Sequence, residues 1–208
     1  MSLLLLGGTA DGRRVAQALH KAGIEVIYSV AGLVRMPKVD CRVISGGFSQ
    51  YGGLDRFIEQ QSIVAILDVT HPFAAKMSAT AVEVARRSGI PCWRFHRPSW
   101  QSQPGDDWQL FSSFEQMLPE LSDKRAIFLT AGQLSQQFVD QLLIDKPRES
   151  GEISAARQLL YRTAAPPKLT LPSNARWLKA IGPFDLEGER ALMQEHCIDA
   201  LVTKDSGG

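Results

Sequence analysis

An Asp, a His and a Pro stand where an apolar stretch of this sequence gives way to a helix. Residues 64–67 are apolar and partly β-branched, so they predict a buried parallel strand that ends at Asp68. Thr70 can cap the helix that follows, and Pro72 suits its first turn. Asp68 and His71 are then polar groups at the carboxyl edge of a sheet, where open α/β sheets bind ligands. We expect ligand-binding or acid–base chemistry at this edge.

A glycine-rich turn near the amino end gives a second candidate site. Residues 3–6 predict a strand, and a helix follows the turn, which is the context of a dinucleotide fingerprint. Its glycine positions hold Gly7, Thr9 and Gly12, so the second departs from G-x-G-x-x-G. Gly7 and Gly8 let the backbone approach a phosphate, and the helix amides and dipole attract one. A tight turn that binds nothing stays the alternative.

The end of the second predicted strand bears on the choice of cofactor. An acid about 20 residues beyond the glycines usually holds the ribose hydroxyls of NAD. The strand at 25–30 ends without an acid, and Arg35 and Lys38 follow it. These cations favour a 2′-phosphate, and hence NADP, unless they are only solvated loop residues.

Two further groups follow strands of the same predicted sheet. Gly46 and Gly47 could form a wall of a cofactor cleft, or only a flexible turn. Arg94, His96 and Arg97 could bind carboxylates, or could be ordinary surface charges.

The chain alternates strands and helices, which predicts parallel sheets covered on both faces. In the first half we expect strands at 3–6, 25–30, 41–44, 64–68 and 91–95 and helices at 13–21, 54–61 and 74–88. In the second half we expect strands at 126–130, 159–162, 177–181 and 200–203 and helices at 134–142 and 185–196. The polar stretch 97–107 predicts a boundary between domains 1–97 and 98–208.

The composition argues against a nucleic-acid-binding or membrane protein. The chain has 208 residues, 44% apolar and 22% charged, which is ordinary for a globular protein. A net charge of +1 gives no basic surplus for nucleic acid or an anionic membrane. The apolar run 3–6 is too short for a signal peptide or membrane span, so we expect a cytoplasmic protein.

The chain has three cysteines, and its carboxyl end is rich in loop-forming residues. Cys41, Cys92 and Cys197 have no paired metal-ligand spacing, so we expect no disulfide or metal site and three buried thiols. Residues 204–208 are typical of a strand-to-helix loop, and we expect that further residues followed it.

Motifs in order along the whole chain resemble those of the precorrin-6A reductase family, which includes the cobalt-precorrin-6A enzymes of cobalamin biosynthesis. The motifs are LLLLGGTADGR at 3–13, SVAG at 29–32, GGF at 46–48, DVTHPFAAKMS at 68–78, RP at 97–98 with Trp100 and GDDW at 105–108, LTAGQ at 129–133, LLYRTAAPP at 159–167, GPF at 182–184 and LVTKDSGG at 201–208. THPFA and TKDSGG are the most specific of them.

The resemblance implies an α/β protein with two Rossmann-like domains, parallel sheets and an interdomain cleft. It implies reduction of one double bond of a tetrapyrrole macrocycle by NADPH, or by NADH in some members. The residues it places at the cofactor, together with those from the motifs above, are Gly7, Gly8, Thr9, Asp11, Ser29, Ala31, Gly32, Arg35, Gly47 and Thr70. Those expected at the substrate are His71, Pro72, Phe73, Arg94, Arg97, Arg162, Lys204, Ser206 and Gly207, with Lys179 as a further available cation.

Three side chains are candidates for charge stabilisation or proton delivery: Asp205, His71 and Lys204. Asp205 comes first, because enclosure by an apolar ligand favours its acid form. His71 comes second and water third. Asp205 could instead cap a helix, and His71 could hydrogen-bond a neighbouring loop.

Rival functions stay open from sequence alone. One is another NADP-dependent oxidoreductase with a different small substrate, and the other is a non-catalytic nucleotide-binding module. We expect a tetrapyrrole as partner, no nucleic acid or membrane, and a monomer or weak dimer.

Overall fold

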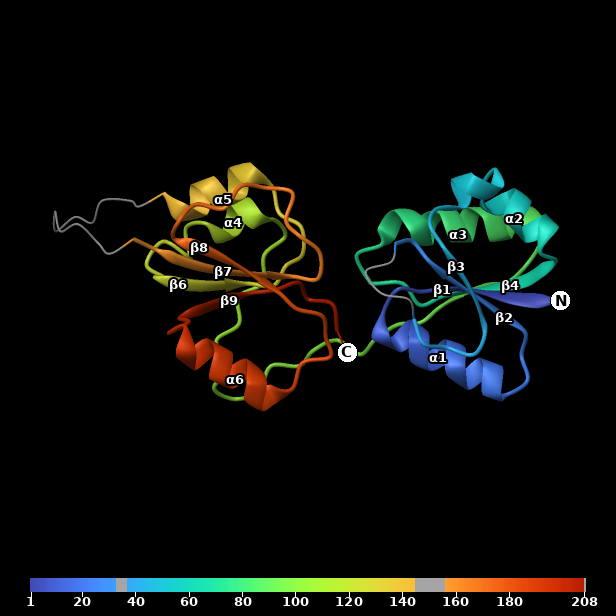
Figure 1. Ribbon diagram of the computed structural model, residues 1–208, viewed down its shortest axis with the longest axis horizontal. Coiled ribbons are helices and arrows are strands. Elements are labelled where there is room, and N and C mark those ends of the chain that lie inside the picture. The colour runs from blue at the N-terminus through green and yellow to red at the C-terminus, as the bar shows by residue number, and fades with distance from the viewer. Residues whose placement is uncertain (33–36, 145–155, 208) are drawn as a thin grey trace. The chain divides into compact units, whose positions relative to one another are not determined.

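The computed structural model describes residues 1–32, 37–144 and 156–207, and Arg35 lies outside them. The chain forms two compact units (Figure 1). The first contains Met1–Trp100 together with Ser206–Gly208, and the second contains Gln101–Asp205. The division into domains 1–97 and 98–208 stays a prediction.

The first unit is a five-stranded parallel sheet with the strand order β3-β2-β1-β4-β5. Its elements are β1 (Ser2–Leu6), α1 (Ala10–Lys21), β2 (Val26–Val30), β3 (Arg42–Ser45), η1 (Phe48–Tyr51), α2 (Leu54–Gln60), β4 (Ile63–Asp68), α3 (Ala75–Ser88) and β5 (Cys92–Arg94). Because β1 leads to β2 on one side and pairs with β4 on the other, the strand order reverses between β1 and β4. Ligands of open α/β sheets bind at this reversal.

Alternation along β1 explains the two layers of helices. Leu4 and Leu6 pack in the core beneath α2 and α3, whereas Leu3 and Leu5 pack with Ala16 of α1. Figure 1 shows α1 on one face of the sheet and α2 and α3 on the other. A strand buried on both faces reads as a continuous apolar run, which is why 3–6 is all leucine.

The second unit is a four-stranded parallel sheet with the order β8-β7-β6-β9. Its elements are α4 (Phe114–Met117), β6 (Ala126–Leu129), α5 (Gln136–Leu143), β7 (Gln158–Thr163), β8 (Ala175–Lys179), α6 (Leu186–Glu195) and β9 (Ala200–Val202). The strand order reverses between β6 and β9. The α/β class with parallel sheets is therefore confirmed.

Several local predictions were wrong. Pro72 lies before α3 rather than in its first turn, because the helix begins only at Ala75. Thr70 does not cap the next helix: α3 begins at Ala75 after Ala74, without a side-chain cap, because the Thr70 hydroxyl donates to Asp68 instead. Cys92 is half-buried rather than buried. Cys197 is exposed rather than buried, because it occupies a positive-φ position (+48°) in the turn after α6.

The described residues contain neither a helix suited to span a membrane nor a cluster of metal-ligating side chains. None of their helices has the length and apolarity needed to cross a bilayer. They also hold no group of three or more His, Cys, Asp or Glu side chains suited to a metal ion.

Candidate functional site

The glycine turn after β1 offers open space at the strand reversal. Gly8 has φ of +113°, and a Cβ placed there would have no atom within 4 Å. Gly7 and Gly12 are different, since a Cβ on either would meet the side chain of Tyr28, at 2.0 and 3.0 Å respectively. Gly7 and Gly12 are therefore needed for close packing on Tyr28, and Gly8 is needed for its positive φ. The exposed side of the turn admits a ligand such as a phosphate.

Thr9 ties this turn to the loop after β4. Its hydroxyl caps α1 by accepting the Gly12 N–H at 3.0 Å, and it donates to the carbonyl oxygen of Val69 at 3.1 Å. The structure thus brings together the predicted residues of the first glycine motif and of the THPFA motif. Thr9 stands where the dinucleotide fingerprint has its second glycine, and here its side chain has a defined bonding role.

A buried carboxylate shapes the loop after β4. Asp68 is 3% exposed and accepts from the Thr70 amide at 3.0 Å and the Thr70 hydroxyl at 2.6 Å. Arg94 lies 3.9 Å from it and also donates to the carbonyl of Pro72 at 3.3 Å. Burial opposes ionisation, but the Ser78 and Thr70 side chains, the Thr70 amide and the Arg94 charge together hold the pKa of Asp68 below its ordinary value.

His71, Pro72 and Phe73 form the exposed tip of this loop. The His71 Nδ1 accepts the Phe73 amide at 3.3 Å, and the two rings stack with centroids 5.6 Å apart. Because Nδ1 is an acceptor, a neutral His71 ring carries its proton on Nε2. Asp68, which stood with His71 as a candidate for ligand-binding or acid–base chemistry, fixes the backbone that presents these side chains.

Asp11 and Arg97 are already paired with each other. The Arg97 Nε donates to Asp11 at 2.6 Å, and the two side chains are only 11% and 17% exposed. Arg14 also binds Asp11. The Arg14 hydrogen bond and the Arg97 interactions lower the pKa of Asp11 against the opposing effect of burial. Gly207 packs here as well, since a Cβ on it would lie 2.6 Å from the carbonyl oxygen of Pro98.

The ends of β2 and β3 complete this edge of the first sheet. Ser29 is buried and its carbonyl accepts the Gly7 amide at 2.8 Å, while Ala31, Gly32 and Gly47 are exposed.

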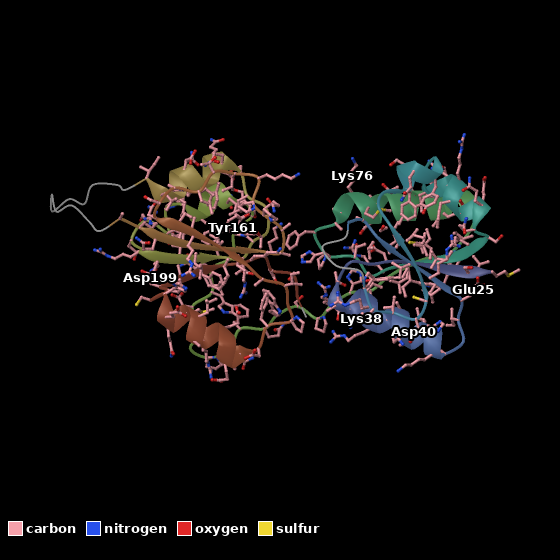
Figure 2. All side chains as sticks on the ribbon, in the orientation of Figure 1. Glu25, Lys38, Asp40, Lys76, Tyr161 and Asp199 are labelled. Atoms are coloured by element: carbon pink, nitrogen blue, oxygen red, sulfur yellow. The ribbon has the colours of Figure 1, made fainter. Side chains whose placement is uncertain are left out.

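The described part of the loop between β2 and β3 contains one acid, Asp40. It is held by the side chain of Gln17 on α1. Lys38 is exposed, and Figure 2 shows it beside α1 together with Asp40.

In the second unit, Lys204 and Asp205 follow β9 at the strand reversal. Lys204 is half-buried and Asp205 is exposed. The Lys204 Nζ would lie 3.8 Å from a Cβ placed on Gly132, in the turn after β6. Thr130 joins the two loops, because its amide and hydroxyl both donate to the Val202 carbonyl, at 2.9 and 3.3 Å.

Arg162 makes its contacts within the second unit. Its guanidinium makes two bonds to Glu189 of α6, at 2.5 and 2.8 Å, and lies 3.8 Å from the ring centroid of Phe184 and 4.8 Å from that of Phe128. The side chain is 9% exposed. The structure therefore gives this predicted substrate contact a packing and ion-pairing role.

Sequence reasoning missed two buried tyrosines that hold the glycine turns. Tyr28 accepts the Gly8 amide at 3.1 Å, and Tyr161, inside the second unit in Figure 2, donates to the Gly132 carbonyl at 2.5 Å. The available signal was a tyrosine directly after two apolar residues, Val26–Ile27 in one strand and Leu159–Leu160 in the other, on the strand next to the one that leads into a glycine turn.

Comparisons with known proteins agree along the chain. The family model described as precorrin-6x reductase CbiJ/CobK matches residues 2–208. A precorrin-6A reductase of Rhodococcus erythropolis is 38% identical over 213 residues, covering 99% of this chain and 79% of the relative. A cobalt-precorrin-6A reductase of Priestia megaterium is 29% identical, covering 99% of this chain and 80% of the relative. A solved structure of CobK precorrin-6A reductase matches with a TM-score of 0.80 and 30% identity, over all of this chain and 79% of that one.

Proposed function

The chain belongs to the precorrin-6x reductase CbiJ/CobK family, and on this premise we propose that it reduces one double bond of precorrin-6A or cobalt-precorrin-6A with a nicotinamide cofactor, in cobalamin biosynthesis. The observation that carries the proposal is the match over residues 2–208, which includes both loops joined by the Thr9–Val69 hydrogen bond. The names of the relatives do not favour another small substrate or a non-catalytic module.

The first unit fits a dinucleotide at the glycine turn. The open space at Gly8 and the amide groups that begin α1 suit a pyrophosphate. Ser29, Ala31, Gly32 and Gly47 are proposed to border the adenosine end.

NADPH is the proposed cofactor rather than NADH. The β2 strand ends at Val30 without an acid, and Asp40, in the described part of the following loop, is held by Gln17. Lys38 is exposed and available to a 2′-phosphate, and Arg35 is a second proposed cation.

The bound cofactor supplies the hydride, and the chain must orient both reactants and deliver a proton. We place the nicotinamide beside Thr70, whose position is fixed by the bonds to Asp68. His71, Pro72 and Phe73 are proposed to contact the macrocycle from the exposed tip of the same loop.

Asp205 is the proposed proton donor. It follows β9 at the strand reversal of the second sheet and is exposed, so a bound substrate could reach its carboxyl group. His71 is the second candidate and would donate from Nε2, since its Nδ1 accepts the Phe73 amide. Lys204 is proposed to stabilise charge on the substrate.

Substrate carboxylates need cationic partners. Arg94, whose side chain is 34% exposed, is the first choice, and Lys204, Ser206 and Gly207 are further proposed contacts. Arg97 and Arg162 are weaker choices, because Asp11 and Glu189 already hold them. The interdomain cleft, a cytoplasmic location and a monomer or weak dimer remain predictions.

The test is turnover under anaerobic conditions with precorrin-6A and its cobalt form, each supplied with NADPH and with NADH. We expect nicotinamide oxidation that matches the loss of the precorrin absorption band, and faster turnover with NADPH. Cofactor binding without oxidation in any of the four mixtures would contradict the proposed reaction.

A further inference from the structure

Tyr28 occupies the space beneath the glycine turn of the first unit. A Cβ at Gly7 would lie 2.0 Å from its ring, and one at Gly12 would lie 3.0 Å from its hydroxyl. The hydroxyl oxygen accepts the Gly8 N–H at 3.1 Å. One side chain therefore contacts the turn at its start, its middle and its entry into α1.

The strand register explains how this residue reaches the turn. Tyr28 pairs with Leu5, one residue before the end of β1, and its side chain lies on the α1 face with Ala16. Tyr28 is 1% exposed, so the partner of the Gly8 amide is a buried hydroxyl and not a solvent water. Burial raises the pKa of Tyr28, which keeps the phenol neutral at physiological pH.

The second unit contains an equivalent arrangement. Tyr161 on β7 pairs with Leu129, the last residue of β6, and its hydroxyl donates to Gly132 in the following turn. Gly132 has a positive φ of +82°, as Gly8 has. In each sheet, the tyrosine thus lies on the strand next to the one that leads into the glycine turn, with the hydroxyl as acceptor in one unit and donor in the other.

We infer that Tyr28 is a positioning residue for the cofactor. Its hydroxyl holds the Gly8 N–H toward the protein interior. The turn therefore keeps the shape in which its exposed side and the first amides of α1 face a phosphate. This rests on the proposed use of the turn for a nicotinamide dinucleotide. A glycine in a positive-φ turn has many alternative conformations, and a buried partner for its amide removes most of them. Preorganisation of this kind acts on affinity, because the ligand no longer has to order the turn.

The variant Tyr28→Phe removes the acceptor and keeps the ring that packs on Gly7 and Gly12. We expect NADPH to bind roughly five- to tenfold more weakly, which is the usual net effect of one hydrogen bond. The KM for NADPH should rise by a similar factor, with kcat at saturating NADPH little changed. Tyr28→Leu also removes the ring and should weaken NADPH binding further.

Tyr161→Phe is the matched control, because it removes an equally buried hydroxyl from the equivalent place in the other unit. We expect it to leave the NADPH dissociation constant unchanged. Circular dichroism and thermal unfolding verify that each variant is folded. A merely structural role for Tyr28 would lower thermal stability in both Phe variants and leave NADPH affinity intact in both.

Fluorescence titration with NADPH decides the question without turnover. Unchanged or tighter NADPH binding by folded Tyr28→Phe would overturn the inference, and tighter binding would mean that the freed Gly8 amide is a better ligand. Failure of the wild-type protein to bind either nicotinamide cofactor would overturn it as well. Normal NADPH binding by the wild type without reduction of precorrin-6A would refute only the proposed substrate, and the titrations of the variants would still test Tyr28.

Discussion

The substitution Gly8→Val tests the glycine turn most severely. Gly8 has φ of +113°, a conformation that costs a residue with a side chain about 1–3 kcal/mol. A Cβ there meets no protein atom within 4 Å, so the valine would project into the space proposed for the pyrophosphate. If it displaces two charge-assisted hydrogen bonds of about 1.5–3 kcal/mol each, roughly two to four powers of ten in affinity are lost.

Gly23→Val separates this effect from backbone strain. Gly23 also has a positive φ, +79°, and a Cβ there would likewise have no atom within 4 Å. It follows α1 and precedes β2, at the opposite edge of the sheet from the turn. We expect both variants to lose similar thermal stability, while only Gly8→Val loses NADPH binding in a fluorescence titration. Unchanged NADPH affinity in folded Gly8→Val, or an equal loss in Gly23→Val, would refute the placement of the cofactor.

Three other substitutions test separate parts of the account. Asp205→Asn should keep substrate affinity and lower kcat by about 10²–10⁴-fold if this group is the general acid, and an unchanged single-turnover rate would exclude it. Asp11 has a lowered pKa in the folded protein. Its ion pairs therefore stabilise the fold above the unfolded pKa of about 3.9, and this stabilisation is lost as the pH falls through the folded pKa. In urea unfolding, Asp11→Asn should be less stable than the wild type at pH 7 and equal to it below the folded pKa, and a difference that does not depend on pH would contradict the ion pairs. Arg162→Met leaves Glu189 without its partner and should cost about 2–4 kcal/mol in the free energy of unfolding, whereas wild-type stability would show that the pair is not formed in solution.

Hydrophobic patterning predicted the order and type of most elements in the described residues. Leucines at 3–6 and the apolar run 64–67 are strands because parallel strands are buried on both faces. The short helix α4 was missed, since its four residues follow a polar stretch and are fixed by packing of Phe114 on Phe138, with ring centroids 4.9 Å apart. Such distant contacts leave no local signal.

The site could be predicted only in part, because contacts between residues far apart in the sequence leave no local signal. The glycine turn and the THPFA loop are local motifs, and the parallel sheet brings them to one edge. Partners chosen by tertiary structure were not foreseeable: Arg97 binds Asp11 from 86 residues away, and Arg162 binds Glu189 from 27. The role of Thr70 was misjudged because a buried Asp68 competes for its hydroxyl more strongly than the helix does.

The most direct test of the central claim is the fate of the hydride. The chain is supplied with precorrin-6A and with NADPH that carries deuterium at the transferred position of nicotinamide C4, and any reduced macrocycle is measured by mass spectrometry. Our account predicts a dihydro product whose macrocycle contains one deuterium atom, with none in a parallel reaction of unlabelled NADPH in D₂O at the carbon that receives the hydride. A reduced macrocycle without label from the cofactor, or no reduced macrocycle at all, would contradict it.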